Sequence, residues 1–279
     1  MRLRFLIVVL LGVFGLSCGG QETNPFFEAS EAPFDCPPFA RIRPEHYLPA
    51  FEEGMRRQQA EIAAVLETTE PASFENTVEA LELSGSLLDK VSNVFFAMNS
   101  AHTSPALQEL ARTIAPRLSL HHDSILLNSE LFRRIEEVHD KGMPETLTAE
   151  QTRLLEETYK DFVRNGARLG EADKSELQQI NRELSLLSVQ FGENVLKETN
   201  AFALVIEDES DLAGLPESAV ATAAEAAAER GQSGKWVFTL DRPSLIPFLQ
   251  FSERRTLREQ LFRAYINRGN NGNEQDNNG

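Results

Sequence analysis

Histidine, cysteine and carboxylate residues are the candidates for chemistry in this chain, and their spacing does not assemble a catalytic site. The five histidines lie at positions 46, 102, 121, 122 and 139. None falls in the H-E-x-x-H pattern, which places two zinc ligands and a glutamate base on one helix face. A P-loop, a G-x-G-x-x-G turn, a C-x-x-C pair and an EF-hand loop are absent as well. We therefore predict no catalytic residue and no metal ligand in this chain.

Two local patterns could still suggest a metal. His121 and His122 are adjacent, so on a helix their side chains point about 100° apart and do not easily share one ion. Because His121 lies on the apolar side of its helix, we expect a core histidine. Glu136 and His139 form a single Glu-x-x-His, whereas a di-iron bundle needs two such motifs and two further glutamates.

Five arginines make the end of the chain basic in an otherwise acidic protein. One interpretation is a solvated or ion-paired helix face. The other is a patch that faces a peptide carboxylate or another domain, because guanidinium groups suit carboxylates. The arginines are Arg254, Arg255, Arg258, Arg263 and Arg268.

The composition describes a folded protein with an acidic surface. Of its 279 residues, 41% are hydrophobic and 25% are charged, which is ordinary for a globular chain. The 27 basic and 43 acidic side chains give a net charge of −16, which repels phosphate backbones and anionic membranes. We therefore expect no nucleic-acid partner, and two cysteines are too few for a disulfide scaffold.

Residues 1–17 have the layout of a bacterial export signal. Two arginines precede an apolar run over residues 5–16 that is too short to span a bilayer, and small residues surround Cys18. This order resembles a lipoprotein signal, in which Cys18 becomes the lipidated N-terminus, although Gly15 stands where leucine is usual. Ordinary signal-peptidase cleavage before Cys18 is the alternative. Either way we expect an exported bacterial protein, in the periplasm or tethered to a membrane through Cys18.

Apolar residues recur with helical spacing through most of the mature chain, so we expect a mainly α fold. Residues 18–47 are rich in proline and are expected to be an extended arm, whereas residues 48–268 form the helical domain. Residues 202–206 and 235–240 read as strands that pair as a small two-strand β element. The expected helices are 48–67, 74–98, 105–125, 129–138, 148–162, 171–199, 216–230 and 252–267.

The longest helix and the end of the chain carry further expectations. Residues 269–279 hold five Asn, three Gly and no apolar residue, which suits either a polar tail or a loop at which the chain is cut. The helix over 171–199 has an apolar stripe along one side, as in an amphipathic helix. The stripe consists of Leu177, Ile180, Leu184, Leu187, Phe191 and Val195.

Several long segments agree in order and spacing with one known family. They are FENTVEALELSGSLLDKVSNVFFAMNSAHTSPALQ (74–108), LLEETYKDFVRNGARL (154–169), INRELSLLSVQFGENVLKETNAFALVIEDESDLAGLP (180–216), GKWVFTLDRPS (234–244) and LREQLFRAYINRGNNGNEQDN (257–277), preceded by Asn24-Pro25-Phe26 and Pro37-Pro38-Phe39. These segments resemble the N-terminal half of the thimet-oligopeptidase family of zinc metallopeptidases, within it the bacterial peptidyl-dipeptidase (dipeptidyl carboxypeptidase) branch.

The resemblance implies the helical half of a clamshell, whose helices wall a narrow substrate channel for short unfolded peptides. In that family an H-E-x-x-H motif and a further glutamate hold zinc in a C-terminal catalytic half. We therefore expect zinc in the complete enzyme, no metal bound by this fragment, and the missing catalytic half as a partner. The complete enzyme is expected to hydrolyse peptides with release of C-terminal dipeptides, while this chain alone is expected to be inactive.

Two alternatives stay open at this point. The first is the oligopeptidase branch of the same family, which cuts peptides internally. The second is a stand-alone lipoprotein that binds peptides without cutting them.

Overall fold

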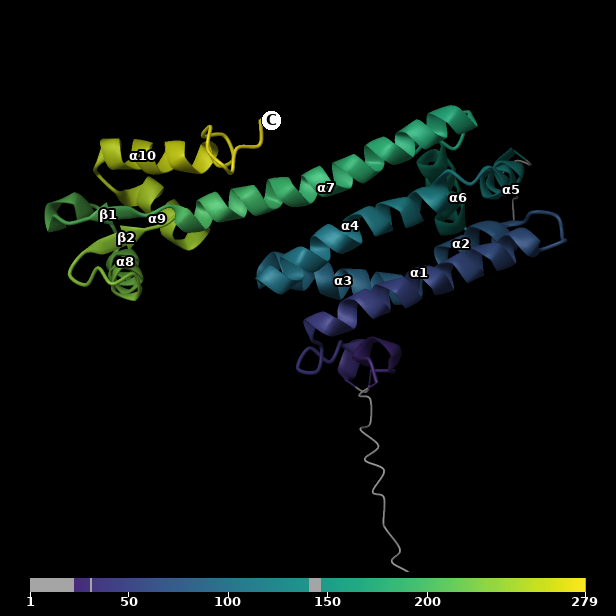
Figure 1. The fold of residues 1–279 in the computed structure, drawn as a ribbon, viewed down its shortest axis with the longest axis horizontal. Helices are drawn as coiled ribbons and strands as arrows, with labels where there is room; N and C mark the ends of the chain where they lie inside the picture. The colour runs from purple at the N-terminus through teal and green to yellow at the C-terminus, as the bar shows by residue number, and fades with distance from the viewer. Residues whose placement is uncertain (1–22, 31, 141–146, 279) are drawn as a thin grey trace, which may run out of the picture.

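Helices dominate the computed structural model, which describes residues 23–30, 32–140 and 147–278 (Figure 1). The mainly α fold class is confirmed. In chain order the α-helices and β-strands are α1 (Pro44–Glu67), α2 (Ala80–Glu82), α3 (Ser86–Ala101), α4 (Pro105–Leu126), α5 (Ser129–Asp140), α6 (Ala149–Arg164), α7 (Glu171–Ala201), β1 (Leu204–Ile206), α8 (Glu217–Glu229), β2 (Trp236–Phe238), α9 (Arg242–Phe251) and α10 (Arg255–Ile266).

The export signal over residues 1–17 and the lipidation site Cys18 lie outside the described residues, so both stay predictions. Across the part of the chain that the structure does describe, no helix combines the length and the apolar character that a bilayer span requires.

Helices α1 to α6 pack into a helical lobe with aromatic side chains at its centre. Phe51 of α1 and Phe95 of α3 are fully buried, and their rings meet edge to face with centroids 5.5 Å apart. Tyr47 extends this cluster, with its ring 5.1 Å from that of Phe95. Aromatic pairs in this geometry add to the stability that burial of their large apolar surface provides. The cluster therefore fixes how α1 and α3 lie against each other.

The proline-rich arm predicted over residues 18–47 is packed against the helical lobe at the two ends of its described part, while residues 32–36 between them are exposed. A single helical turn at Pro25–Phe27 packs against α1 and α3, and Phe26 is buried against Tyr47. Asn24 holds this turn, because its side chain accepts from the Phe26 N–H and donates to the His46 carbonyl at 2.8 Å. In addition, α1 begins at Pro44, inside the expected arm. Apolar contacts thus outweigh the extended tendency of the prolines.

Polar caps begin several of these helices. Ser73 accepts from the Asn76 N–H, and the Asn76 side chain accepts from the Ser73 N–H in return. Thr148 and Gln151 form the same reciprocal pair at the start of α6, and Ser104 caps α4. Each cap satisfies backbone N–H groups that the helix itself leaves without a partner.

The single helix predicted over residues 74–98 is wrong. The chain instead makes a π-helical turn at Phe74–Glu79, continues through α2, and breaks before α3. The break is at Gly85, whose φ of +80° is a left-handed conformation that favours glycine. Its N–H donates to the carboxylate of Glu61 on α1 at 2.7 Å. The apolar spacing continues across this break, which is why periodicity alone merges the two helices.

A small lobe is built on the two strands. β1 and β2 pair antiparallel with Leu204 opposite Phe238, so the predicted β element is confirmed. Helices α8, α9 and α10 cover this two-stranded sheet, and the rings of Phe238 and Phe248 lie 4.6 Å apart in the core. Helix α9 is not predicted from the sequence, because Pro243 and Pro247 fall within its ten residues.

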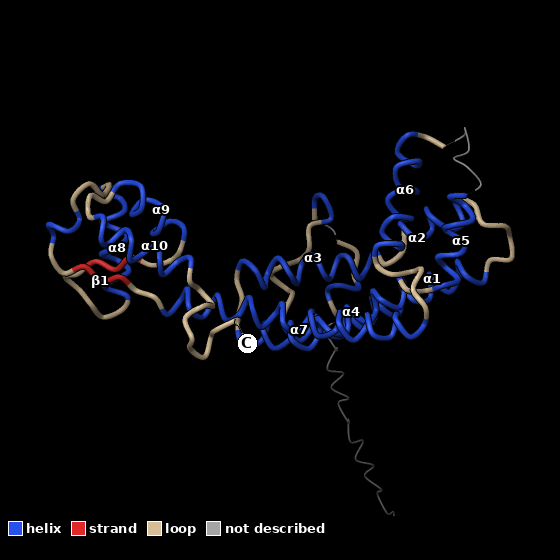
Figure 2. The backbone as a smooth tube through the Cα atoms, turned by 90° about the horizontal axis from the view of Figure 1, so that it is seen from above, coloured by secondary structure: helices blue, strands red, loops and turns tan. Residues whose placement is uncertain are grey.

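Helix α7 joins the two lobes, as both views show (Figures 1 and 2). It packs on α4 through polar contacts: Asn181 donates to Asp123 at 2.8 Å, and Glu193 pairs with Arg112 at 2.6 Å. The predicted apolar stripe is not the packing face. Four of its six residues are exposed, with Phe191 57% accessible to solvent. They are Ile180, Leu184, Leu187 and Phe191.

The C-terminal loop (residues 269–278) is folded against the end of α7, so the interpretation as a free polar tail is wrong. The carboxylate of Glu198 accepts hydrogen bonds from the Gly269 N–H and from the side-chain amides of Asn271 and Asn273. Asn194 donates to Asn277 at 2.9 Å. The asparagines of this segment therefore act as specific donors and acceptors.

Glu198→Gln should weaken the attachment of this loop in a pH-dependent way. Burial raises the pKa of Glu198, but hydrogen bonds from Asn271, Asn273 and Gly269 outweigh it together and hold the pKa below its ordinary 4.5. A lowered carboxyl pKa stabilises the fold above the unfolded-state pKa, and that contribution is lost as pH falls through the folded-state pKa. We expect Glu198→Gln to cost about 1 kcal/mol of unfolding free energy at pH 7.

Urea unfolding of the wild type and the variant at pH 7 and at successive values below 4.5 measures this effect. The difference between the two proteins should shrink as the pH falls. Glu183→Gln, at an exposed position on the same helix, is the matched control and should leave stability unchanged. A difference that is the same at every pH would show that the charge on Glu198 does not hold the loop.

Candidate functional site

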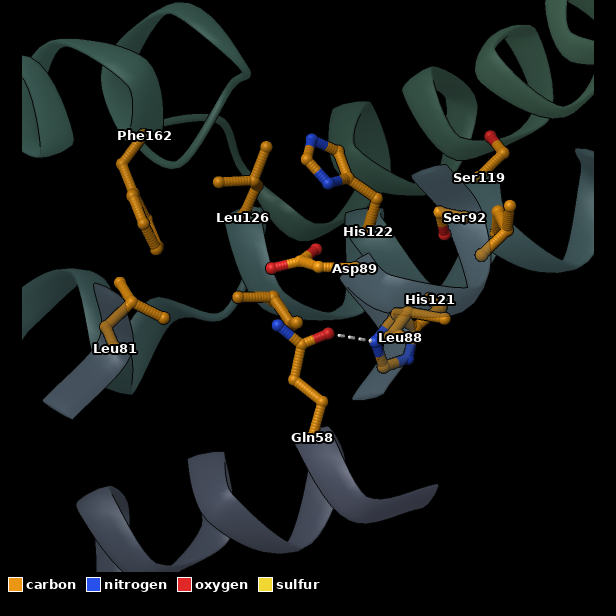
Figure 3. Close-up of a pocket in the computed structure, with 12 residues that line it drawn as sticks. Gln58, Leu81, Leu88, Asp89, Ser92, Ser119, His121, His122, Leu126 and Phe162 are labelled. Carbon is orange, nitrogen blue, oxygen red and sulfur yellow. Dashed lines mark hydrogen bonds between the residues drawn. The ribbon is translucent and has the colours of Figure 1, made fainter. Parts of the chain in front are cut away.

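A cavity of about 570 Å³ opens between α1, α3, α4 and α6 in the helical lobe (Figure 3). Leu81, Leu126 and Phe162 form an apolar wall on one side of it. Polar side chains line the rest, among them Gln58, Asp89, Ser92, Ser119, His121 and His122. A ligand site is typically a mainly apolar hollow that contains a small number of convergent polar groups.

His121 is held at the inner wall of this cavity by Gln58. The amide of Gln58 donates to Ser84 at 3.3 Å, so its carbonyl oxygen accepts from Nε2 of His121 at 2.7 Å. This assigns the proton to Nε2 and leaves Nδ1 as an acceptor. Nδ1 is buried and has no hydrogen-bond partner among the described residues. Burial, together with the nearby His122, lowers the pKa of His121, so the ring is neutral at pH 7.

Asp123 follows two residues later but faces α7 instead of the cavity. It is 5% exposed, one carboxylate oxygen accepts from Asn181, and the other is buried without a partner within the described part of the chain. Burial raises the pKa of Asp123, and the Asn181 hydrogen bond only partly opposes this. His121, His122 and Asp123 therefore point to α1, to solvent and to α7 respectively.

Asp89, in the first turn of α3, carries the charge at the cavity. Its carboxylate points into the space bordered by Leu126 and Gln58 (Figure 3). The side chain has no hydrogen bond or ion pair within the ranges that the structure describes. No lysine or arginine is among the described residues that line the cavity. Sequence reasoning missed Asp89 and Gln58, because each is one polar residue on a helix with no motif around it.

The other metal candidates are engaged in structural contacts. Glu136 accepts from Arg168 at 2.8 Å, and the ring of His139 stacks on Tyr159 at a centroid distance of 3.9 Å. His46 closes the start of α1 by accepting from the Arg43 N–H. Within residues 23–30, 32–140 and 147–278, no group of three or more His, Cys, Asp or Glu side chains could hold a metal ion. The described residues therefore do not fit a zinc site.

Four of the five arginines at the end of the chain have contacts within the protein, and two of these contacts are ion pairs. Their contacts anchor α10 to neighbouring segments and to α7, through a hydrogen bond from Arg268 to Thr199 at 3.0 Å. The partners are Asp211 for Arg254, the Ser252 carbonyl for Arg258, Glu259 for Arg263 and the ring of Tyr265 for Arg268.

No family model matches the chain, but curated relatives do. This chain is 40% identical over 253 residues to the dipeptidyl carboxypeptidase of Escherichia coli (strain K12). The aligned region covers 91% of this chain and 37% of that protein. The dipeptidyl carboxypeptidase of Salmonella typhimurium is 38% identical over 92% of this chain and 38% of its own length. Oligopeptidase A of Salmonella typhimurium is 31% identical over 91% of this chain and 37% of its own length. The chain thus spans well under half the length of these relatives.

Asp123→Asn should stabilise the isolated protein at neutral pH. A raised carboxyl pKa means that the folded state binds the proton more tightly, so stability falls as pH rises through the raised pKa. Asparagine keeps an acceptor for Asn181 and removes the buried charge. Urea unfolding at pH 7 and pH 4 should show a gain for the variant at pH 7 that shrinks at pH 4. A loss of stability at pH 7 would show that α7 needs the ionised carboxylate.

Proposed function

Because the chain belongs to the thimet oligopeptidase family of dipeptidyl carboxypeptidase and oligopeptidase A, we propose that it is the peptide-binding portion of a zinc metallopeptidase that releases C-terminal dipeptides. Its helices would form one wall of the channel that admits short unfolded peptides. Activity, substrate and partners of the whole protein belong to this proposal, since the chain spans 37% of the length of the Escherichia coli relative.

One observation carries the proposal: the 40% identity to dipeptidyl carboxypeptidase over 91% of the chain. Identity to oligopeptidase A over a similar share is lower, at 31%. The difference favours removal of dipeptides over internal cleavage. The oligopeptidase activity is therefore the alternative that the experiment below must distinguish.

The part of this chain in the reaction would be to bind peptides and to exclude folded proteins. Its described residues do not fit a zinc site, so no step of metal chemistry is assigned to them. In the proposal, zinc is held by polypeptide that corresponds to the remaining part of the relatives. The carboxylate of Asp89, which lines the cavity, is a group that a bound peptide would contact.

The exposed apolar face of α7 supports a second part of the proposal, namely contact with that remaining polypeptide. Ile180, Leu184, Leu187 and Phe191 follow one another at steps of three and four residues, so they form a continuous strip. Contiguous exposed apolar surface of this kind marks an interaction site. The C-terminal loop is bound to the same helix through Glu198 and through Asn194, which donates to Asn277.

Export is also proposed, from the residues of the leader alone. The basic start and the short apolar run over residues 5–16 favour translocation, and Cys18 is placed for lipidation. Such a lipid would tether the peptide-binding portion of the enzyme to a bacterial membrane.

A chimera tests the proposed function. Residues 24–278 of this chain would replace the matching segment of the Escherichia coli dipeptidyl carboxypeptidase, and the products of defined peptides would be identified by mass spectrometry. We expect zinc-dependent release of C-terminal dipeptides. A ladder of internal cuts would favour the oligopeptidase alternative. A folded, zinc-loaded chimera without activity would contradict the proposal.

Leu187→Glu in the chimera tests the apolar face. The substitution should lower dipeptide release at least tenfold, because it places a charge in the proposed contact. In the isolated chain the same substitution should leave the melting temperature unchanged, since Leu187 is exposed there. Equal dipeptide release by the chimera with and without Leu187→Glu would exclude this face as the contact.

A further inference from the structure

We propose that the cavity between α1, α3, α4 and α6 binds the side chain of a lysine or arginine of a bound peptide, with Asp89 as the pairing carboxylate. The inference rests on the proposed function, because it specifies which peptides this lobe prefers. The ligand group that it assigns to the cavity is a cation at the end of an apolar stem.

The first argument is the charge that Asp89 leaves unbalanced. On the neighbouring helices, Glu53 is paired with Arg56 and Arg57, and Glu109 is paired with Arg112. Asp89 points into the cavity and has no such partner among the described residues (Figure 3). A cation that enters this space would be attracted by this exposed carboxylate at the cavity.

The second argument is the hydrogen-bonding character of the cavity. The Asp89 carboxylate offers only acceptors, and no lysine or arginine is among the described residues that line the cavity. A guanidinium group carries five N–H donors and an ammonium group three, and neither has an acceptor. A cationic side chain therefore complements Asp89, whereas an anionic one would be repelled by it.

The third argument is the apolar wall. Leu81, Leu126 and Phe162 lie on the side of the cavity toward which the Asp89 carboxylate points (Figure 3). Lysine and arginine bury their methylene stems on such surfaces while the charged end reaches a polar partner. The net charge of −16 on the chain adds a long-range attraction for basic peptides.

Titration calorimetry on the full chain tests the inference with two acetylated pentapeptides, alike except for arginine or citrulline at the central position. Citrulline keeps the shape of arginine and lacks its charge. The measurement is made at pH 8, so that His121, whose pKa is lowered by burial, stays neutral. We expect the arginine peptide to bind at least tenfold more tightly, and Asp89→Asn to remove that preference.

Asp173→Asn is the matched control, because Asp173 is an exposed carboxylate in the first turn of α7, away from the cavity. It should keep the preference. The imidazole resonances of His121 should shift on addition of the arginine peptide and not of the citrulline peptide, which localises binding. Equal affinity for both peptides, or a preference that Asp89→Asn retains, would overturn the inference while peptide binding itself stands. No binding of either peptide would overturn both the inference and the proposed peptide-binding role.

Discussion

The polar contacts between α4 and α7 determine the shape of this protein. Asn181 donates to the buried Asp123, and Glu193 pairs with Arg112, so α7 lies on α4 in one rotational setting. A buried carboxylate that loses its partner is costly, which makes this setting specific even though ion pairs at exposed sites contribute little. Because the helix continues beyond α4, the same contacts also position the small lobe at its far end (Figure 1).

This orientation accounts for the two surfaces to which a function is assigned. It turns the strip that includes Leu187 and Phe191 toward solvent, where further polypeptide of the peptidase can cover it. On the other side of α4, His121 is directed to α1 and lines the cavity that Asp89 enters from α3. One helix, α4, thus divides a surface for protein contact from a cavity for a peptide side chain. Both assignments suit a lobe that binds substrate while the catalytic groups reside elsewhere.

Much of the fold follows from local signals in the sequence. Helices were located from apolar periodicity, because it is a local pattern of residues three and four positions apart. The face that α7 buries could not be predicted, since it is decided by Asp123 on another helix. The break at Gly85 was hidden by apolar spacing that continues across it. His121 was identified as a core residue, but its partner Gln58 lies 63 positions away and leaves no local pattern.

The rotational setting of α7 is tested most directly by thiol accessibility. With Cys18 and Cys36 replaced by serine, Leu187→Cys and Val189→Cys place a single thiol on the outward face or on the side packed against the helical core. We expect the thiol at position 187 to react with a maleimide near the rate of a free peptide, and the thiol at position 189 to react at least tenfold more slowly. The reverse order would show that the apolar stripe is buried, and it would contradict the proposed contact face.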